Sequence, residues 1–114
     1  MTDAMWPMPW VRAALDLAVL ASLTEGRLHG YAIAQSLEGH GFGLLKGGSL
    51  YPVLGRLEEA GDVDAAWVEG QGGPGRREYE LTAAGRDRLE RELASWRELG
   101  DTLTTMSTGA IGHG

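Results

Sequence analysis

The sequence predicts a mainly helical α+β fold, in which three short helices precede a two-stranded hairpin and a long final helix. Apolar residues recur at helical spacing in four separate stretches of the chain. Two short β-compatible runs, 63–68 and 78–81, flank a segment with Gly-Gly-Pro-Gly, which is typical of a hairpin loop. Three helices followed by a two-stranded wing make a winged helix-turn-helix, and this is the fold class that we predict.

The first helix is predicted from Trp10 to about Leu23, because apolar side chains give this stretch a broad face suited to burial. These side chains are Val11, Ala14, Leu15, Ala18, Val19 and Leu20. Residues 1–9 are few and include two prolines, so we expect a flexible N-terminal arm before the helix.

The second helix is predicted to open at His29-Gly30-Tyr31, after a break at Gly26. Its inward face is expected to carry Tyr31, Ile33, Ala34 and Leu37. Residues 39–48 are rich in glycine, and we predict a flexible connection there.

The third helix has sequence signals at both ends. Ser49 is predicted to cap the first turn. Pro52 is tolerated in that turn, because a backbone N–H at its position would have no partner within the helix. Gly61 is expected to end the helix by adopting a left-handed backbone conformation. The buried face has Leu50, Val53, Leu54 and Leu57. The outer face is left with Ser49, Tyr51, Pro52, Gly55 and Arg56. An exposed Tyr-Pro pair is poor core material, so this face is predicted to touch another molecule.

The final helix is predicted to begin after Thr82, a residue suited to cap it. Its apolar residues form a near-heptad stripe of Leu89, Leu93, Trp96, Leu99, Leu103 and Met106. A chain this small cannot bury the whole stripe, so we predict a homodimer formed through Leu89 to Leu103 of the stripe together with Leu15. The predicted organisation is an arm (1–9), a winged helix-turn-helix DNA-binding domain (10–82), a dimerisation helix (83–106) and a disordered tail (107–114).

Composition limits the function classes. The 114 residues suffice for one small domain, and no apolar run is long enough to cross a bilayer. The absence of cysteine excludes disulfides and thiolate metal sites and fits a cytoplasmic location. The net charge of −6 counts against nucleic-acid binding, but a local basic patch is sufficient to bind phosphate.

The third helix and the hairpin loop are predicted to read DNA, because a helix fits the major groove and its first residues reach bases and phosphates. Lys46 is expected to neutralise a phosphate, and Ser49 to hydrogen-bond one. Tyr51, beside Pro52, either packs its ring on a thymine methyl or bonds a phosphate with its hydroxyl.

Three arginines are further candidates. Arg76 and Arg77 follow the glycine-rich loop, which would bring them to the backbone or into the minor groove. Arg56 lies late in the third helix, where it either contacts DNA or pairs with Glu58 or Glu59 and stabilises the fold.

His29 and Tyr31 open the second helix, and a helix N-terminus can hold a phosphate through its free N–H groups. Tyr31 is equally suited to packing between helices. The histidines have no paired ligand spacing, so no metal site is predicted. Ser49 lacks a nucleophile elbow and the glycine-rich loops match no phosphate-binding motif, so we predict neither an enzyme nor a cofactor.

Four motifs resemble those of the PadR family of bacterial transcriptional regulators. They are Leu28-His29-Gly30-Tyr31, Gly48-Ser49-Leu50-Tyr51-Pro52, Arg56-Leu57-Glu58 and Leu81-Thr82-x-x-Gly85. The resemblance implies a winged helix with one C-terminal dimerisation helix, as in the smaller subfamily, and a repressor that binds a palindromic operator. The chain departs from the pattern at Gly55, Asp62, Glu78 and Glu80, and these changes lower the positive charge near the predicted DNA face.

Four tryptophans in so short a chain raise the question of a ligand. Some relatives hold flat or phenolic ligands between the dimer helices, so one interpretation is a pocket lined by Trp96 with Trp10 or Trp6, and with Met8. The other interpretation is that Trp96 fills the dimer core.

We therefore expect a homodimeric repressor of a pseudo-palindromic operator, released by a small aromatic or hydrophobic ligand. Its third helices would enter major grooves, and its wings the flanking minor grooves. One alternative is a winged-helix protein-interaction module that does not touch DNA, which the acidic charge favours. Another is a dimer that sequesters small aromatics. Salt-dependent DNA affinity separates the first alternative from the regulator.

Overall fold

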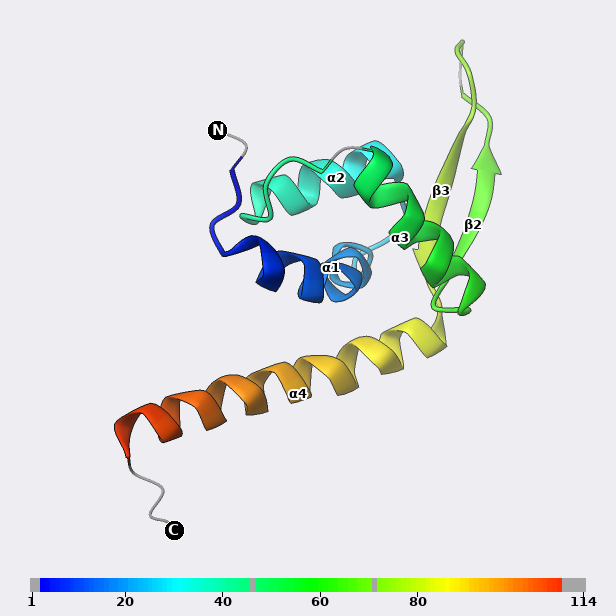
Figure 1. Cartoon of the computed structure of the whole chain (residues 1–114). Coiled ribbons are helices and arrows are strands. Elements are labelled where there is room, and N and C mark those ends of the chain that lie inside the picture. Colours follow the sequence, from blue (N-terminus) through cyan, green and yellow to red (C-terminus); the bar gives the residue numbers. More distant parts are fainter. Residues whose placement is uncertain (1–2, 46, 71, 110–114) are drawn as a thin grey trace.

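The computed structural model describes residues 3–45, 47–70 and 72–109, and within them the chain forms four helices and three strands (Figure 1). The helices are α1 (Met8–Ser22), α2 (Gly30–Gly39), α3 (Gly47–Glu59) and α4 (Ala83–Thr108). The strands are β1 (Leu28–His29), β2 (Val63–Val68) and β3 (Arg76–Leu81). The first three helices pack together beside the sheet, whereas α4 runs past α1 and extends away from the other elements (Figure 1). The predicted winged helix-turn-helix with a long C-terminal helix is confirmed.

The sheet has the strand order β1-β3-β2, with both pairings antiparallel. Val63 pairs with Leu81 and Trp67 with Arg77, so β2 and β3 form the predicted hairpin, which projects beyond the helices (Figure 1). The third strand was not predicted from the sequence, because β1 is two residues long and is defined only by its pairing with Tyr79 and Glu78. β3 also begins at Arg76, two residues before the predicted start.

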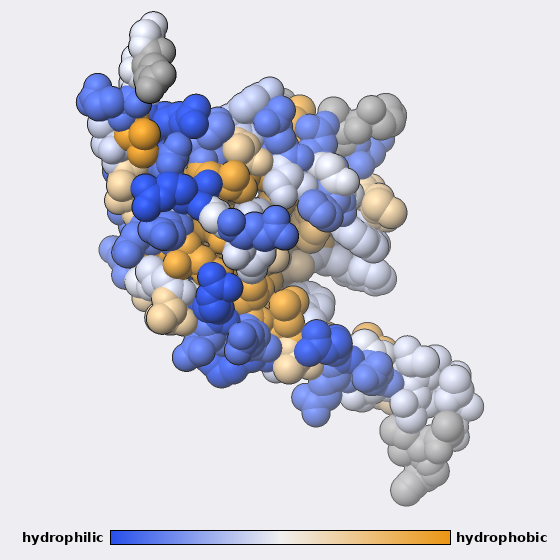
Figure 2. Space-filling model, turned by 180° about the vertical axis from the view of Figure 1, so that it is seen from behind, coloured by the Kyte–Doolittle hydropathy of each residue, from blue (hydrophilic) through white to orange (hydrophobic). Residues whose placement is uncertain are grey.

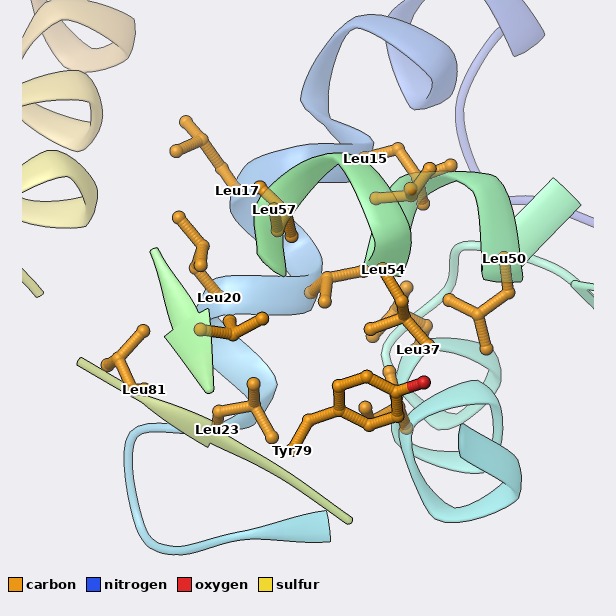
Figure 3. Close-up of a cluster of buried hydrophobic side chains, with 14 of the residues drawn as sticks. Leu15, Leu17, Leu20, Leu23, Leu37, Leu50, Leu54, Leu57, Tyr79 and Leu81 are labelled. Atoms are coloured by element: carbon orange, nitrogen blue, oxygen red, sulfur yellow. The ribbon is translucent and has the colours of Figure 1, made fainter. Parts of the chain in front are cut away.

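The core lies between the three short helices and the sheet. Leucines of α1, α2 and α3 surround Tyr79 and Leu81 of β3 (Figure 3). Leu15 and Leu89 belong to this core and are almost fully buried within the chain. Their predicted place on the dimer surface is therefore corrected, since the helical stripe turns inward at Leu89 where α4 passes α1.

In the segment before α1, Met5 and Trp6 contact the turn that follows α2, and the flexibility predicted for this arm stays a prediction. α1 begins at Met8, two residues earlier than predicted. The backbone N–H of Met5 donates to the Gly41 carbonyl oxygen at 2.8 Å, and the rings of Trp6 and Phe42 meet edge to face at 5.4 Å. The segment before α1 thus covers the turn that follows α2.

α3 begins at Gly47, so Ser49 is inside the helix and does not cap it, contrary to the prediction. Pro52 consequently lies in the second turn, where it has no N–H to donate to the Gly48 carbonyl oxygen. The predicted left-handed conformation at the end of the helix is confirmed, because Gly61 has a φ of +83°.

α4 joins the domain through a cap and a close contact. The hydroxyl oxygen of Thr82 accepts from the Gly85 N–H at 2.9 Å, which confirms the predicted cap. A Cβ atom at Gly85 would overlap the carbonyl oxygen of Asp62, so glycine allows α4 to pack tightly on the start of β2. The helix continues to Thr108, so the predicted tail begins inside it, and residues 110–114 lie outside the described residues. None of the described helices has both the length and the apolar character needed to cross a membrane.

Candidate nucleic-acid interface

The outer face of α3 is the first part of the candidate interface. Leu50, Val53, Leu54 and Leu57 are buried, whereas Ser49, Tyr51, Pro52, Gly55 and Arg56 are exposed, as predicted. Tyr51 is 54% exposed, an unusual exposure for a large aromatic side chain in the middle of an ordered helix.

Tyr51 lies directly against the start of α2. A Cβ atom at Gly30 would be 2.6 Å from the Tyr51 hydroxyl oxygen and 2.9 Å from a ring carbon. Glycine at position 30 therefore gives the tyrosine ring its space. Two motifs that are distant in sequence, His29-Gly30-Tyr31 and Leu50-Tyr51-Pro52, form one surface.

His29 and Tyr31 flank Gly30 on this surface. His29 ends β1 and immediately precedes α2, and its ring centroid is 6.3 Å from that of Tyr31. Tyr31 is 66% exposed, so the prediction that it faces inward is wrong. It lies in the first turn of α2, on the side away from Ile33, which is fully buried in the core. We call His29, Tyr31 and Tyr51 the aromatic cluster.

The wing arginines lie in the first residues of β3 rather than in the loop, and each contacts a carboxylate. The Arg76 guanidinium donates to Glu78 at 3.2 Å. Arg77 donates to both carboxylate oxygens of Glu58 on α3, at 2.8 and 2.9 Å. Its guanidinium carbon is also 5.9 Å from the ring centroid of Tyr79. The pKa of Arg77 is raised by the Tyr79 side chain and then by Glu58, so it stays charged.

Arg56 makes neither of its predicted pairings with Glu58 or Glu59. It donates to the Asp16 carboxylate of α1 at 2.7 Å, which turns it toward the body of the domain. Lys46, the other predicted phosphate contact on this side, lies outside the described residues.

Arg88 of α4 contacts three carboxylates. It donates to Asp62 at 2.8 Å, to Glu92 at 3.0 Å and to Asp16 at 3.4 Å. Hydrogen bonding to Asp62 raises the pKa of Arg88, which remains charged although it is partly buried. Asp16 of α1 therefore forms ion pairs with both Arg56 of α3 and Arg88 of α4. These ion pairs connect α3 to α4 through α1.

The predicted stripe on α4 is exposed beyond Leu89. Trp96 is 39% exposed and Leu103 57%, and Leu93, Leu99 and Met106 are exposed as well. Apolar side chains also reach the surface where α4 leaves the rest of the molecule, on a face that is otherwise largely hydrophilic (Figure 2). An exposed apolar stripe of this length indicates a binding surface.

A groove of about 560 Å³ lies between α1, the end of α2 and the middle of α4. Its lining includes Leu17, Ala18, Leu37, Phe42, Leu93 and Trp96. Trp10 and Met8 are exposed and do not line it, so a single chain does not bring them to Trp96 as predicted. Trp6 reaches the groove only indirectly, through its ring contact with Phe42.

Comparison with known proteins decides the family. Residues 19–91 match the family described as Transcriptional regulator PadR-like family, a span that includes α2, α3, the wing and the first part of α4. The chain belongs to the PadR-like family of transcriptional regulators. The identification drawn from the four motifs is thus confirmed, and it agrees with the prediction that the chain is not an enzyme.

Two relatives illustrate the similarity in sequence. Transcriptional regulator Rv3488 of Mycobacterium tuberculosis is 33% identical over 105 residues, which cover 90% of this chain and 94% of that protein. An uncharacterized 37.1 kDa protein in transposon TN4556 of Streptomyces fradiae is 42% identical over 87 residues, and the match spans 74% of this chain but only 23% of that protein.

Two solved structures illustrate the similarity in fold. A PadR family transcriptional regulator from Eggerthella lenta is 31% identical with a TM-score of 0.79, and the match covers 87% of this chain and 86% of that one. Bacillus subtilis PadR in complex with operator DNA is 28% identical with a TM-score of 0.63, covering 70% of this chain and 45% of that one.

Three residues of this PadR-like interface were missed in the sequence analysis. In the sequence, Asp16 and Arg88 have the pattern of ordinary solvated charges on amphipathic helices, and Glu58 stands out only in a family motif and as a possible partner of Arg56. Their pairings join residues 19 to 72 positions apart, which spacing along one helix does not reveal. The one available signal was Asp62, an acidic residue where an apolar one was expected, because its burial requires a cationic partner.

Proposed function

We propose that this PadR-like regulator is a homodimeric repressor that binds a pseudo-palindromic operator, with α3 in the major groove and the β2–β3 wing in the flanking minor groove. The observation that carries the proposal is the aromatic cluster. It gathers an exposed Tyr51, Tyr31 and His29 at the joined starts of α2 and α3. Helix starts are where N–H groups and short polar side chains meet phosphates and base edges.

The residues along the exposed face of α3 support a close approach of this helix to DNA. Gly48, Pro52, Gly55 and Glu59 follow one another at helical spacing and are all exposed. A Cβ atom at Gly48 or Gly55 would have no neighbour within 4 Å, so the helix backbone is open to a groove there. Glu59 is the exception, because its charge repels phosphate.

The exposed half of α4 supports the dimer. Leu93, Trp96, Leu99 and Leu103 continue a coiled-coil-like repeat with no partner in the described chain, and a second copy would bury it. In the dimer the groove beside Leu93 and Trp96 would adjoin the partner's helix. Its volume lies within the roughly 300–1,000 Å³ of small-molecule sites, so it is where we place an apolar effector.

The test is binding to the promoter DNA of its own and the neighbouring gene, measured by fluorescence anisotropy at several salt concentrations against a scrambled duplex. Selective binding by a dimer, with affinity that falls steeply with salt, is the expected result. Since a regulator must reach DNA, we also place the protein in the cytoplasm.

A second candidate is a winged-helix protein-interaction module. It is favoured by the pairing of Arg56, Arg76 and Arg77 with carboxylates, which leaves little unpaired positive charge on the described part of the interface. A folded dimer that binds promoter DNA no better than scrambled DNA would move the assignment to this module.

A further inference from the structure

Glu58 and Arg77 join the two elements that are proposed to enter adjacent grooves. Glu58 is the last residue but one of α3, and Arg77 is the second residue of β3. One nitrogen of the guanidinium, Nη2, lies 2.8 Å from Oε1 and 2.9 Å from Oε2 of the carboxylate. The side chain of Arg77 is 51% exposed and that of Glu58 40%, so both are accessible to a ligand from solution.

A carboxylate and a phosphate compete for the same guanidinium. Each presents two oxygen atoms that share a negative charge and can accept parallel N–H donors, so arginine can bind either of them in a bidentate manner. Glu58 accepts hydrogen bonds from Nη2 alone, and its negative charge offsets that of the guanidinium, so Arg77 attracts a DNA phosphate less strongly while this pair is intact. The charge of Arg76 is offset in the same way, although Glu78 is its neighbour on the same strand and moves with it.

We propose that Glu58 sets the affinity for DNA, because its ion pair with Arg77 competes with the binding of Arg77 to phosphate. Duplexes whose phosphates do not displace Glu58 are therefore bound more weakly. This inference rests on the proposed DNA-binding function. It explains how a chain with a net charge of −6 would keep its contact with general DNA weak and exchangeable. Glu58 is thus an internal anion that competes with DNA phosphate for Arg77.

The test compares the wild type with Glu58→Gln, which keeps the size of the side chain and removes its charge. On scrambled duplex we expect binding about threefold tighter, in keeping with the modest strength of exposed ion pairs. The salt slope should steepen by about 0.9 for each phosphate contact that is added. Both side chains are exposed, so the circular dichroism spectrum and unfolding midpoint should be unchanged.

The matched control is Glu59→Gln, which removes the same charge from the next residue of α3 but makes no ion pair in the described structure. Each change is also made in an Arg77→Met background. The gain in DNA affinity from Glu58→Gln should disappear in this background. Any gain in affinity from Glu59→Gln should persist, because it reflects only the removal of one negative charge near the DNA.

Two results would overturn the inference. A gain from Glu58→Gln that survives in the Arg77→Met background would mean that the pair does not withhold the arginine. Weaker binding by Glu58→Gln would mean that Glu58 orients Arg77 toward DNA. If promoter and scrambled DNA bind equally, the operator proposal fails, while the comparison on scrambled duplex still decides the role of Glu58.

Discussion

The ring of Tyr51 occupies the space that a side chain at Gly30 would need. The two residues are 21 positions apart, yet a Cβ atom on one would stand 2.6 Å from the hydroxyl oxygen of the other. The position of the Tyr51 ring therefore depends on a glycine of the preceding helix. This relationship yields a prediction that separates DNA binding from folding.

Gly30→Ala should weaken operator binding about tenfold, close to the effect of Tyr51→Ala, because losing one hydrogen bond to a charged phosphate costs about 1.5 kcal/mol. Unfolding should change little, since the atoms that the new methyl meets belong to the outer end of an exposed side chain. Anisotropy and urea unfolding measure the two effects. Gly39→Ala, where the added Cβ has open space, is the control, and full operator affinity in both Gly30→Ala and Tyr51→Ala would remove Tyr51 from the interface.

Replacing Arg76 and Arg77 together by alanine should flatten the salt dependence of promoter binding. Each phosphate contact that is lost lowers the log–log slope by about 0.9. The measurement is a series of affinities at increasing salt. An unaltered slope would show that neither arginine exchanges its carboxylate for phosphate even on the operator.

Leu93→Glu should dissociate the dimer, because it places a charge in the apolar stripe that the partner helix is proposed to cover. Leu93 is 39% exposed in the single chain, so the isolated fold should tolerate the change. Sedimentation velocity would report a monomer. Ala94→Glu, on the opposite side of α4, adds the same charge and should leave the dimer intact; a stable Leu93→Glu dimer would place the interface elsewhere.

Arg88→Met should lower the free energy of unfolding by about 2 kcal/mol. The change leaves the buried Asp62 carboxylate without its 2.8 Å partner. Breaking a fully buried pair costs roughly 3–5 kcal/mol, and the smaller value is expected here because the Arg88 side chain is 24% exposed. Urea unfolding checks the value against Arg91→Met, an exposed change on the same helix that should have little effect.

Gly85→Ala and Gly55→Ala should have opposite effects on stability, although both place alanine in a helix. At Gly85 the methyl would overlap the Asp62 carbonyl oxygen, so we expect a loss of about 1–3 kcal/mol. At Gly55 the space is open, so we expect a gain of about 0.5–1 kcal/mol from the better helix former. Thermal unfolding of both variants measures the two changes in stability. Stabilisation by Gly85→Ala would show that α4 does not pack closely against the Asp62 backbone.

The elements of the domain were largely predictable because each has a local signal. The two faces of α3 follow from its apolar spacing, and the end of α3 follows from Gly61, whose backbone is left-handed. Thr82 caps α4 as its side chain suggests. The start of α3 was misplaced by three residues, since a cap at Ser49 predicts Leu50 as the first helical residue and the glycines before it look like part of a loop.

Sequence patterns by themselves determined the family, the helix faces and the exposed stripe on α4, because residue spacing, caps and turns are local properties of the chain. Only the tertiary structure decided which charges meet and which aromatic residues gather. Arg56 faces Asp16, Arg77 faces Glu58 and Tyr51 faces Gly30, and each contact joins separate elements. The three-stranded sheet has the same origin, since β1 exists only where β3 pairs with it. Such contacts depend on how helices and strands pack in space, and periodicity along one element carries no information about that.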